Sequence, residues 1–284
     1  MRISGTTKVF GVLGWPVAHS LSPVFQSIAM EKAGEDAVYV PFPCPPERVA
    51  EAARGLHAAG VAGLNLTVPH KEAALALAES ADSDAREIGA ANTWIRTDTG
   101  WHAANTDWIG LVRAIRRWDR AGGWDALLFG AGGAARAAAK ALAELGARTV
   151  WITNRTLTRA EQLVEDAARL WPQTHWSVVP WEAGAVERAA ETARWVINAT
   201  ALGLSGEAFP FAVPGEGFAM DLVYRPDGRT PFVEAAERAG RRATDGLWML
   251  VEQGLVSLQR WTGHAVSADE VIAEMQALLG RSGI

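Results

Sequence analysis

The sequence predicts a two-domain α/β protein in which helices cover both faces of a parallel β-sheet. Three observations support this fold class. Strand-like and helix-like patterns alternate along the chain, which is the order that parallel sheets require. The 284 residues are enough for one large domain or two ordinary ones. A glycine-rich turn joins an apolar strand pattern to a helix pattern within residues 126–146, as in nucleotide-binding sheets.

The elements expected in the first domain alternate from residue 8 onward. Residues 8–14, 37–43 and 63–68 have the short apolar or alternating patterns of strands. Helical spacing covers residues 45–60 and 70–81. A further helix is expected at residues 107–118, where Ile109, Val112 and Ile115 are spaced to share one face.

A second series of elements starts after the polar turn at residues 119–125. The run at 126–130 is apolar throughout, which is typical of a strand buried in a parallel sheet. It is followed by an expected helix at 133–146, a strand at 148–154 and a helix at 157–170. Later strands are expected at 194–200 and 218–224, so this part of the chain predicts a sheet with crossover helices.

The tail holds two helical patterns, at residues 247–263 and 267–280, with Ser267 as the expected N-cap of the second. Two successive helices with no strand between them fit poorly into the second series. We therefore expect them to pack on the first domain and to make it discontinuous. The expected substrate-binding and catalytic domain is 1–112 plus 247–284, and the expected nucleotide-binding domain is 113–246.

Composition and charge narrow the classes of partner. A net charge of −5 argues against nucleic acid as the main partner, because phosphate binding needs a clustered basic face. The single cysteine, Cys44, cannot form an internal disulfide, and no Cys/His spacing typical of metal sites occurs. No run of about 18 apolar residues appears, and the N-terminus lacks the apolar core of a signal peptide. We expect a cytoplasmic protein that binds no membrane and no metal.

The glycine-rich turn matches the G-x-G-x-x-G/A pattern of dinucleotide-binding folds, with Gly130, Gly132 and Ala135 at the three positions. The first glycine permits the tight turn, the second lets a pyrophosphate approach the backbone, and the small third residue permits close helix–strand packing. By itself a glycine triplet also fits a flexible turn. Here it lies between a strand pattern and a helix pattern, which is the context that dinucleotide binding requires.

The end of the next strand favours NADP over NAD. A site for NAD usually has an acidic residue there, which binds the ribose 2′-hydroxyl. This strand ends instead at Asn154, Arg155 and Thr156, and Arg159 follows one helical turn later. Two guanidinium groups and a hydroxyl suit a 2′-phosphate. The alternative is that Arg155 and Arg159 belong to a solvated helix face.

Lys71 lies at an unusual place, because a positive charge at a helix N-terminus opposes the helix dipole. Other polar residues also follow short apolar runs, where open α/β sheets bind ligands; they are Ser20, Ser22, Asn65, Thr67, Asn92 and Asp107. Hydroxyls, amides, one cation and one carboxylate suit a polyhydroxylated, anionic small molecule. Structural alternatives remain, with Ser22 as a helix N-cap before Pro23, Asn92 and Asn105 as turn residues, and Asp107 as a helix cap.

Several motifs resemble those of shikimate dehydrogenases in order and spacing, over essentially the whole chain. They are HSLSP, NLTVPHK, GAANT, NTD, GAGGAAR, NRT, INAT and DLVYRP followed by TPF. The resemblance implies an N-terminal α/β substrate domain completed by C-terminal helices, and a Rossmann-type nucleotide-binding domain with a parallel sheet. It also implies reduction of 3-dehydroshikimate to shikimate with NADPH, a step of chorismate and aromatic amino-acid biosynthesis, by a monomer or homodimer.

The resemblance also implies roles for individual residues. Lys71 and Asp107 match the catalytic pair. The substrate carboxylate is expected at Ser20 and Ser22 with Tyr224 nearby, and the ring hydroxyls are expected at Asn65, Thr67, Lys71, Asn92, Asp107 and Gln253. NADP(H) is expected at Gly130, Ala131, Gly132, Gly133, Ala134, Asn154, Arg155, Thr156 and Arg159, with Thr200, Leu222 and Gly246 beside the nicotinamide.

Lys71 then has a chemical purpose. A neighbouring carboxylate favours the charged form of a lysine, so Lys71 beside Asp107 is expected to be an ammonium at neutral pH. It is suited to bind the ketone oxygen, to stabilise the developing alkoxide and to donate the proton as hydride arrives. His19 and His70 flank the motifs and are interpreted as structural, because the lysine already fills the proton role.

Two stretches depart from the family pattern. Leu204 stands in NATALGL where methionine is frequent, and Trp248 replaces a small residue in DGLWMLVEQG. Both departures bear on the nicotinamide side of the expected site. They concern the residues expected to contact the cofactor there more than the reaction.

Rival interpretations fall into two classes. Among enzymes, the alternatives are a quinate/shikimate dehydrogenase with broader substrate or NAD use, an amino-shikimate variant, and a methylene-tetrahydrofolate dehydrogenase. Two first-motif serines without a bulkier threonine favour shikimate over quinate, and neither Tyr39 nor Tyr224 lies on a helix with a lysine, as the folate enzyme requires. A non-catalytic NADP-sensing protein is the alternative outside enzymology, and it would need neither Lys71 nor Asp107.

Overall fold

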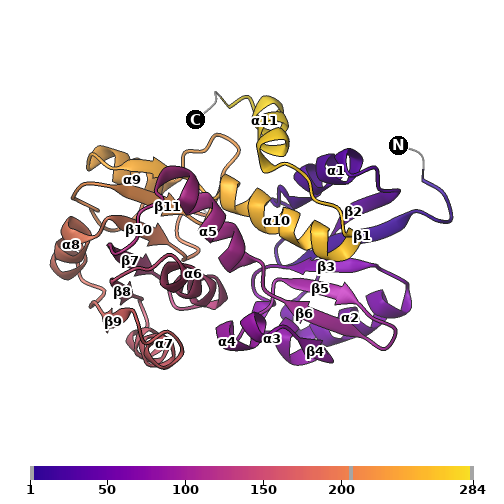
Figure 1. Ribbon diagram of the computed structural model, residues 1–284, viewed down its shortest axis with the longest axis horizontal. Coiled ribbons are helices and arrows are strands. Elements are labelled where there is room, and N and C mark those ends of the chain that lie inside the picture. Colours follow the sequence, from indigo (N-terminus) through magenta and orange to yellow (C-terminus); the bar gives the residue numbers. More distant parts are fainter. Residues whose placement is uncertain (1–2, 205–206, 282–284) are drawn as a thin grey trace. The chain divides into compact units, whose positions relative to one another are not determined.

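The structure is a computed structural model that describes residues 3–204 and 207–281, and it divides the chain into two compact units. The first unit runs up to Gly110 and resumes at Leu250, and the second unit is Leu111–Met249. Each unit has its own β-sheet with helices packed on it, as Figure 1 shows. The C-terminal helices therefore return to the unit in which the chain starts.

The sheet of the first unit has the strand order β2-β1-β3-β5-β6-β4. Its strands are β1 (Lys8–Gly14), β2 (Ala37–Pro43), β3 (Gly63–Leu66), β4 (Ser80–Ala81), β5 (Thr93–Arg96) and β6 (Trp101–Ala104). β1 pairs in parallel with β2 and β3, whereas β5 runs antiparallel to β3 and to β6. This sheet is therefore mixed, because the connection between β5 and β6 is too short for the crossover that a parallel pair needs.

The helices of the first unit are α1 (Ser22–Lys32), α2 (Val49–Ala58), α3 (Lys71–Leu77), α4 (Ser83–Ile88) and α11 (Ala268–Leu279), with a 3₁₀ turn at Pro46–Arg48. The helix expected at 70–81 ends at Leu77. Beyond it the backbone N–H groups of Glu79 and Asp82 donate to carbonyls of Trp101 and Ala103 on β6. Pairing with a neighbouring strand thus overrides the local helical pattern. Ser267 is confirmed as the N-cap of α11, because its side chain accepts from the Glu270 N–H.

The sheet of the second unit is parallel throughout and has the order β12-β11-β10-β7-β8-β9. Its strands are β7 (Asp125–Phe129), β8 (Thr149–Thr153), β9 (His175–Val178), β10 (Trp195–Asn198), β11 (Phe218–Asp221) and β12 (Arg242–Thr244). This is the order of a Rossmann-type sheet, in which the winding direction reverses between β7 and β10. The expected parallel sheet is confirmed for this unit. Ligands of such sheets bind at the carboxyl ends of the strands beside that reversal.

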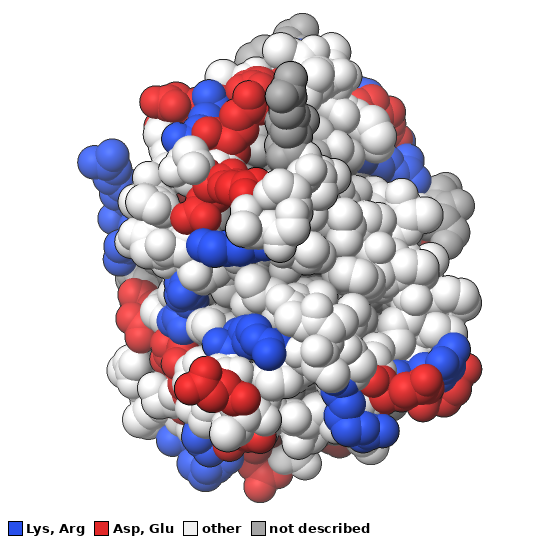
Figure 2. Space-filling model, turned by 90° about the vertical axis from the view of Figure 1, so that its right-hand side faces the viewer, with Lys and Arg blue, Asp and Glu red and all other residues white. Residues whose placement is uncertain are grey.

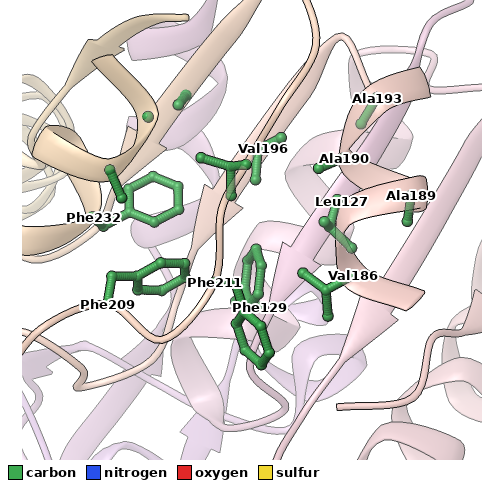
Figure 3. Close-up of a cluster of buried hydrophobic side chains, with 14 residues drawn as sticks. Leu127, Phe129, Val186, Ala189, Ala190, Ala193, Val196, Phe209, Phe211 and Phe232 are labelled. Carbon is green, nitrogen blue, oxygen red and sulfur yellow. The ribbon is translucent and has the colours of Figure 1, made fainter. Parts of the chain in front are cut away.

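The helices that lie wholly within the described part of the second unit are α6 (Gly133–Glu144), α7 (Leu157–Leu170), α8 (Ala183–Thr192) and α9 (Pro231–Arg238). Figure 3 shows an apolar cluster on one face of this sheet, with Phe129 beside Phe211, Phe209 and Phe232. The Phe129 and Phe209 ring centroids are 5.1 Å apart, in an edge-to-face arrangement that suits aromatic pairs. Phe129 is fully buried and ends β7, so the core holds the residue directly before the glycine-rich turn.

Two long helices, α5 (Asp107–Trp118) and α10 (Leu247–Thr262), begin in one unit and end in the other. The part of α10 in the first unit is packed tightly on its sheet. The indole of Trp261 donates from Nε1 to the Trp94 carbonyl at 3.0 Å and covers Gly63, where a side chain would collide with the ring. Gly254 similarly lies against the Phe25 ring. These contacts explain why small residues occur at both positions.

Candidate functional site

The centre of the candidate site is an ion pair between two residues at the starts of two helices. Lys71 begins α3 just after β3, and Asp107 begins α5 just after β6. Lys71 Nζ donates to Asp107 Oδ2 at 2.6 Å, and the two side chains are only 16% and 7% exposed. The ammonium thus has a carboxylate partner in a largely desolvated setting, where charge-assisted hydrogen bonds are strong.

Asn92 holds the second oxygen of that carboxylate. Its Nδ2 donates to Asp107 Oδ1 at 2.9 Å and also lies 2.9 Å from Gln253 Oε1. Its Oδ1 accepts from the Thr106 N–H at 2.7 Å, which fixes the amide orientation. Lys71 and Asn92 therefore hold the two oxygens of the Asp107 carboxylate. This fixes the orientation of the carboxylate and the position of the Lys71 ammonium beside it.

A buried polar network extends from this pair to Asn65 at the end of β3. Asn65 Oδ1 accepts from the Tyr39 hydroxyl at 2.8 Å, and its Nδ2 lies 3.0 Å from Ser257 Oγ. Ser257 Oγ is 2.8 Å from Thr93 Oγ1 and 3.1 Å from Thr106 Oγ1. Every residue of this network is buried, so its hydrogen bonds are shielded from water and hold the amide groups of the site in fixed orientations.

Sequence patterns alone do not single out the supporting residues Tyr39, Thr93, Thr106 and Ser257. Thr93 and Thr106 lie inside the GAANT and NTD motifs, next to residues that were selected, so those motifs carried the available signal. Ser257 lies on α10, four residues after Gln253, which places both on one helix face. That spacing is the only trace of its role in the sequence.

Ser20, Ser22 and Thr67 lie in the first unit near the ends of β1 and β3. Ser20 Oγ accepts from the Ser22 N–H at 3.2 Å, and Ser22 is 5% exposed. The interpretation of Ser22 as an N-cap is wrong, because α1 already begins at Ser22 and its N-cap is Leu21. The methyl group of Thr67 packs on Gly14, where a Cβ atom would lie 2.4 Å from Thr67 Cγ2.

The structure distinguishes structural from site roles for the other polar residues. Asn105 holds its turn, since its Oδ1 accepts from the Asp107 N–H at 3.1 Å. Asn92 instead joins β5 to the segment before α5, and the Asp107 carboxylate binds Lys71 and Asn92. His70 is buried, and its Nε2 lies 2.8 Å from the Cys44 carbonyl. Burial lowers the pKa of His70, partly offset by that hydrogen bond, which fits a structural residue.

The glycine-rich turn occupies the expected place in the second unit, between β7 and α6. Gly130 has a φ of +112°, and a Cβ there would lie 3.0 Å from the Ala199 carbonyl oxygen, so two constraints require glycine. Gly132 is the N-cap of α6 and provides no capping side chain. A Cβ on Gly132 would meet nothing within 4 Å, so protein packing does not require glycine there. An uncapped helix N-terminus beside open space fits a pyrophosphate.

The residues expected at the adenosine ribose follow β8. Asn154 Nδ2 donates to the Thr156 carbonyl at 2.8 Å, which closes the turn into α7. Arg155 and Arg159 are exposed. Among the residues that the structure describes, no carboxylate lies within ion-pair distance of either guanidinium. Both are therefore available to an anionic ligand, and the side chains present fit a 2′-phosphate.

Thr200, Leu222 and Gly246 follow β10, β11 and β12 at the carboxyl edge of the same sheet. Thr200 donates from its N–H and Oγ1 to Asn198 Oδ1, at 3.1 and 2.6 Å. Tyr224 lies two residues after Leu222 and is half-buried. The two departures from the family pattern are also in this unit, where Leu204 is exposed and the Arg117 guanidinium stacks on the Trp248 ring at 3.7 Å.

Asp221 is a buried carboxyl group in the second unit that was not among the expected site residues. It accepts from Thr230 Oγ1, Asn198 Nδ2 and the Val223 N–H, at 2.6, 2.9 and 3.0 Å. Burial raises the pKa of Asp221 to about 7, with a smaller contribution from Asp245, while its three donors favour the anion. The motif DLVYRP contained this residue, but its burial has no signature in the sequence.

The raised pKa of Asp221 predicts a pH dependence of stability. The folded protein keeps the proton at pH values where the unfolded chain has lost it, so the stability that this adds is complete below about pH 4. It is lost as the pH rises through about 7. Between pH 5 and 8, urea unfolding should show the wild type losing about 2–3 kcal/mol relative to Asp221→Asn. Parallel pH profiles of the two proteins would contradict this.

The described surface and side chains give three further observations. On the face that Figure 2 shows, basic and acidic side chains lie side by side, and neither sign forms a continuous band. Within residues 3–204 and 207–281, no group of three His, Cys, Asp or Glu side chains is placed to hold a metal ion. No helix in these ranges is both long and apolar enough to cross a membrane.

Three family models match the chain in the order expected from its motifs. They are the shikimate dehydrogenase substrate binding domain at residues 12–94, shikimate / quinate 5-dehydrogenase at residues 114–176, and the shikimate 5'-dehydrogenase C-terminal domain at residues 246–276. Together they match parts of both units.

Similar proteins cover the chain almost completely. A shikimate dehydrogenase (NADP(+)) of Anaeromyxobacter sp. strain Fw109-5 is 44% identical, over 99% of both chains. One of Geobacter metallireducens is 40% identical, over 93% of this chain and 94% of that protein. The crystal structure of the Thermus thermophilus enzyme in complex with NADP(H) and shikimate is 36% identical, with a TM-score of 0.83 over 95% of this chain and 99% of that chain. By sequence and fold, the chain belongs to the shikimate dehydrogenase family.

Proposed function

We propose that the protein reduces 3-dehydroshikimate to shikimate with NADPH, a step of the chorismate pathway to the aromatic amino acids. The observation that carries this proposal is the partly buried Lys71–Asp107 ion pair, with 2.6 Å between Nζ and Oδ2, held by Asn92. It provides a proton donor among amides and hydroxyls that suit a polyhydroxylated ring. Relatives that share at least 40% identity are named shikimate dehydrogenase (NADP(+)), which supports the same reaction.

We propose that two parts of the chain bind the substrate and the cofactor separately. Residues 1–112 with 247–284 bind the substrate, and residues 113–246 bind NADP(H). The polar network around Asn65 and Asn92 supports the first assignment, and the Rossmann-type sheet with its glycine-rich turn supports the second. Ser20 and Ser22 bind the carboxylate with Tyr224 nearby. The ring hydroxyls bind Asn65, Thr67, Lys71, Asn92, Asp107 and Gln253.

The proton transfer follows from the same geometry. NADPH, when bound, supplies the hydride to the ketone carbon. Lys71 donates one N–H to the carbonyl oxygen, stabilises the negative charge that develops there and then gives up that proton, which completes the alcohol. Asp107 keeps the amine in place, and Asn92 keeps Asp107 in place, until water returns a proton to Lys71.

The cofactor residues have separate tasks in this proposal. Gly130 to Ala134 hold the pyrophosphate against the N-terminus of α6. Asn154, Arg155, Thr156 and Arg159 hold the 2′-phosphate and its ribose, which favours NADP over NAD. Thr200, Leu222 and Gly246 border the nicotinamide.

One spectrophotometric experiment tests the proposal. The purified protein is given shikimate or quinate with NADP or NAD at mildly alkaline pH, and the absorbance of the reduced nicotinamide is followed. Fast turnover restricted to shikimate with NADP supports the assignment. Comparable turnover of quinate, or with NAD, would reassign the protein to the broader quinate/shikimate dehydrogenases. Binding of NADPH without turnover of any of these substrates would make it an NADP-sensing protein.

Gly132 provides a second test, because protein packing tolerates a side chain at this position whereas pyrophosphate binding does not. Gly132→Ala adds a methyl group that no protein atom opposes, at a φ of −91° that alanine adopts easily. Unfolding by urea should therefore change little, whereas NADPH binding should weaken by about 10- to 100-fold through collision with the pyrophosphate.

Gly55→Ala is the matched control for Gly132→Ala. Gly55 lies inside α2 with nothing within 4 Å of a Cβ, so this change should stabilise the protein by about 0.5–1 kcal/mol and leave NADPH binding as in the wild type. Undiminished NADPH binding by Gly132→Ala would place the pyrophosphate elsewhere.

We further propose that the protein acts in the cytoplasm as a monomer or homodimer. The lone cysteine, Cys44, is buried, so no disulfide of this chain calls for an oxidising compartment. Size-exclusion chromatography with light scattering distinguishes 30.4 kDa from twice that mass. A larger assembly would contradict the proposal.

A further inference from the structure

Three loops at the carboxyl edge of the second sheet are joined through one pair of residues. Asn198 ends β10 and Asp221 ends β11, and the two are direct neighbours in the parallel register. β10 and β11 lie side by side in Figure 1. Both side chains are fully buried, and Asn198 Nδ2 donates to Asp221 Oδ1 at 2.9 Å. A buried carboxyl group needs such partners, because burial without them is costly.

The hydrogen bonds around Asp221 suit a carboxylate. The Asn198 amide and the Val223 N–H can only donate at these contacts, and both reach Oδ1. Thr230 Oγ1 accepts from the Val233 N–H at 3.2 Å, which leaves its hydroxyl proton for Asp221 Oδ2 at 2.6 Å. Three donors therefore meet two acceptor oxygens, and none of these bonds needs a proton on Asp221.

Hydrogen bonds link the three loops to this pair, the first two directly and the third through Val223. After β10, the N–H and hydroxyl of Thr200 donate to Asn198 Oδ1. After β11, the Leu222 N–H donates to the Asn198 carbonyl at 2.8 Å. After β12, the Gly246 N–H donates to the Val223 carbonyl at 3.0 Å. The three residues assigned above to the border of the nicotinamide thus depend on one buried anchor.

The close packing of the third loop makes the anchor rigid. A Cβ on Gly246 would lie 2.5 Å from the Leu222 carbonyl oxygen and 3.1 Å from the Asp221 carbonyl oxygen. The backbone of the loop after β12 therefore rests directly on the end of β11. A shift of Asp221 or of Leu222 would be transmitted to Gly246 without a flexible side chain to absorb it.

We propose that Asp221 is a positioning residue for the nicotinamide: its buried carboxylate, through Asn198, Thr230 and Val223, sets the relative positions of Thr200, Leu222 and Gly246. Asp221 does not touch the cofactor. The inference rests on the proposed function, since it assumes that these loops border the nicotinamide. It assigns the aspartate and threonine of the motif DLVYRP–TPF a task in cofactor binding, in addition to holding the motif together.

Asp221→Asn tests the proposal most directly, because it keeps the shape and replaces one acceptor oxygen by an N–H donor. At pH 8, fluorescence titration should show NADPH binding weakened roughly tenfold, as expected when a charge-assisted network becomes neutral. Steady-state kinetics should show a raised KM for NADPH and a lowered kcat, with the KM for 3-dehydroshikimate changed less than about twofold. This split would not arise from a general loss of folded protein.

Variants at Thr230 give a second, independent test. Thr230→Val removes the hydroxyl that donates to Asp221, and it should weaken NADPH binding in the same direction. Thr230→Ser keeps the hydroxyl and should restore binding to near the wild-type value. Thr230 also caps α9, and serine preserves that cap, so the valine–serine pair decides the question even if Asp221→Asn fails to fold.

Asp125→Asn is the matched control. Asp125 begins β7 at the opposite edge of the same sheet, where it pairs with the exposed Arg148. The change removes the same charge from the same sheet, and NADPH binding should remain as in the wild type.

Two results would overturn the inference: wild-type NADPH affinity in Asp221→Asn, or equal affinities in Thr230→Val and Thr230→Ser. Absence of NADPH binding or of shikimate turnover in the wild type would instead contradict the proposed function. The affinity comparison separates the two cases, because it needs no turnover.

Discussion

Replacing Lys71 with alanine is expected to lower kcat by about 10²–10⁴-fold, while the KM for 3-dehydroshikimate changes by less than about fivefold. Lys71 Nζ is the proton donor of the proposed reaction, so its removal acts mainly in the transition state, where charge develops on the oxygen. The remaining amides and hydroxyls still hold the substrate. Steady-state kinetics in the reducing direction measure both constants. A raised KM with an unchanged kcat in Lys71→Ala would make Lys71 a binding residue.

Lys8→Ala is the matched control for Lys71→Ala. Lys8 also forms an ion pair with a carboxylate, Glu35 at 3.2 Å, but its side chain is 54% exposed. Exposed ion pairs contribute little, so this variant should keep wild-type kinetics and nearly wild-type stability. A loss of activity in both variants would point to a general effect of removing a lysine.

Replacing both Arg155 and Arg159 with glutamine is expected to weaken NADPH binding by about 10²–10⁴-fold, because each charge-assisted hydrogen bond to a phosphate is worth about 1.5–3 kcal/mol. NADH lacks the 2′-phosphate, so activity with NADH should change little and the preference for NADPH should largely disappear. Titration with both cofactors, followed by kinetics, measures this change in preference.

Arg169→Gln is the control for the double variant. Arg169 lies in the last turn of α7, and its side chain is 71% exposed beside Asp166. It carries the same charge on the same helix, away from the end of β8, so cofactor preference should remain. If the double variant behaves like Arg169→Gln, then Arg155 and Arg159 belong to a solvated helix face and the preference for NADP needs another source.

Local sequence patterns predicted the first elements of the second unit closely. The apolar run at 126–130, the glycines at 130, 132 and 133, and the alanine-rich helix are contiguous, and they form β7, the turn and α6 within one or two residues of the expected bounds. Strand–turn–helix units of this kind are encoded by neighbouring residues. Helices α8 and α9 and strands β9 and β12 were missed, and they lie in the stretches 171–193 and 225–246, where no expectation was made.

Local sequence patterns predicted the elements of the first unit less well. The hairpin of β5 and β6 was missed, because its strands have four residues each and include polar and charged side chains. The helix expected at 70–81 lost its last residues to β4, since pairing with β6 satisfies backbone groups that an isolated helix end leaves unpaired. Short elements of this kind depend on their neighbours in space.

The sequence by itself determined the residue types of the candidate site, the order of its motifs and the family to which the chain belongs. Tertiary structure decided what those residues do to one another. Lys71 and Asp107 are 36 positions apart, and Asn65 and Ser257 are 192 apart, so their hydrogen bonds exist only because the sheet and the returning helix α10 bring them together. Burial likewise decided the character of Asp221, because removal from water raises the pKa of a carboxyl group, and the burial of a single polar residue cannot be measured from sequence.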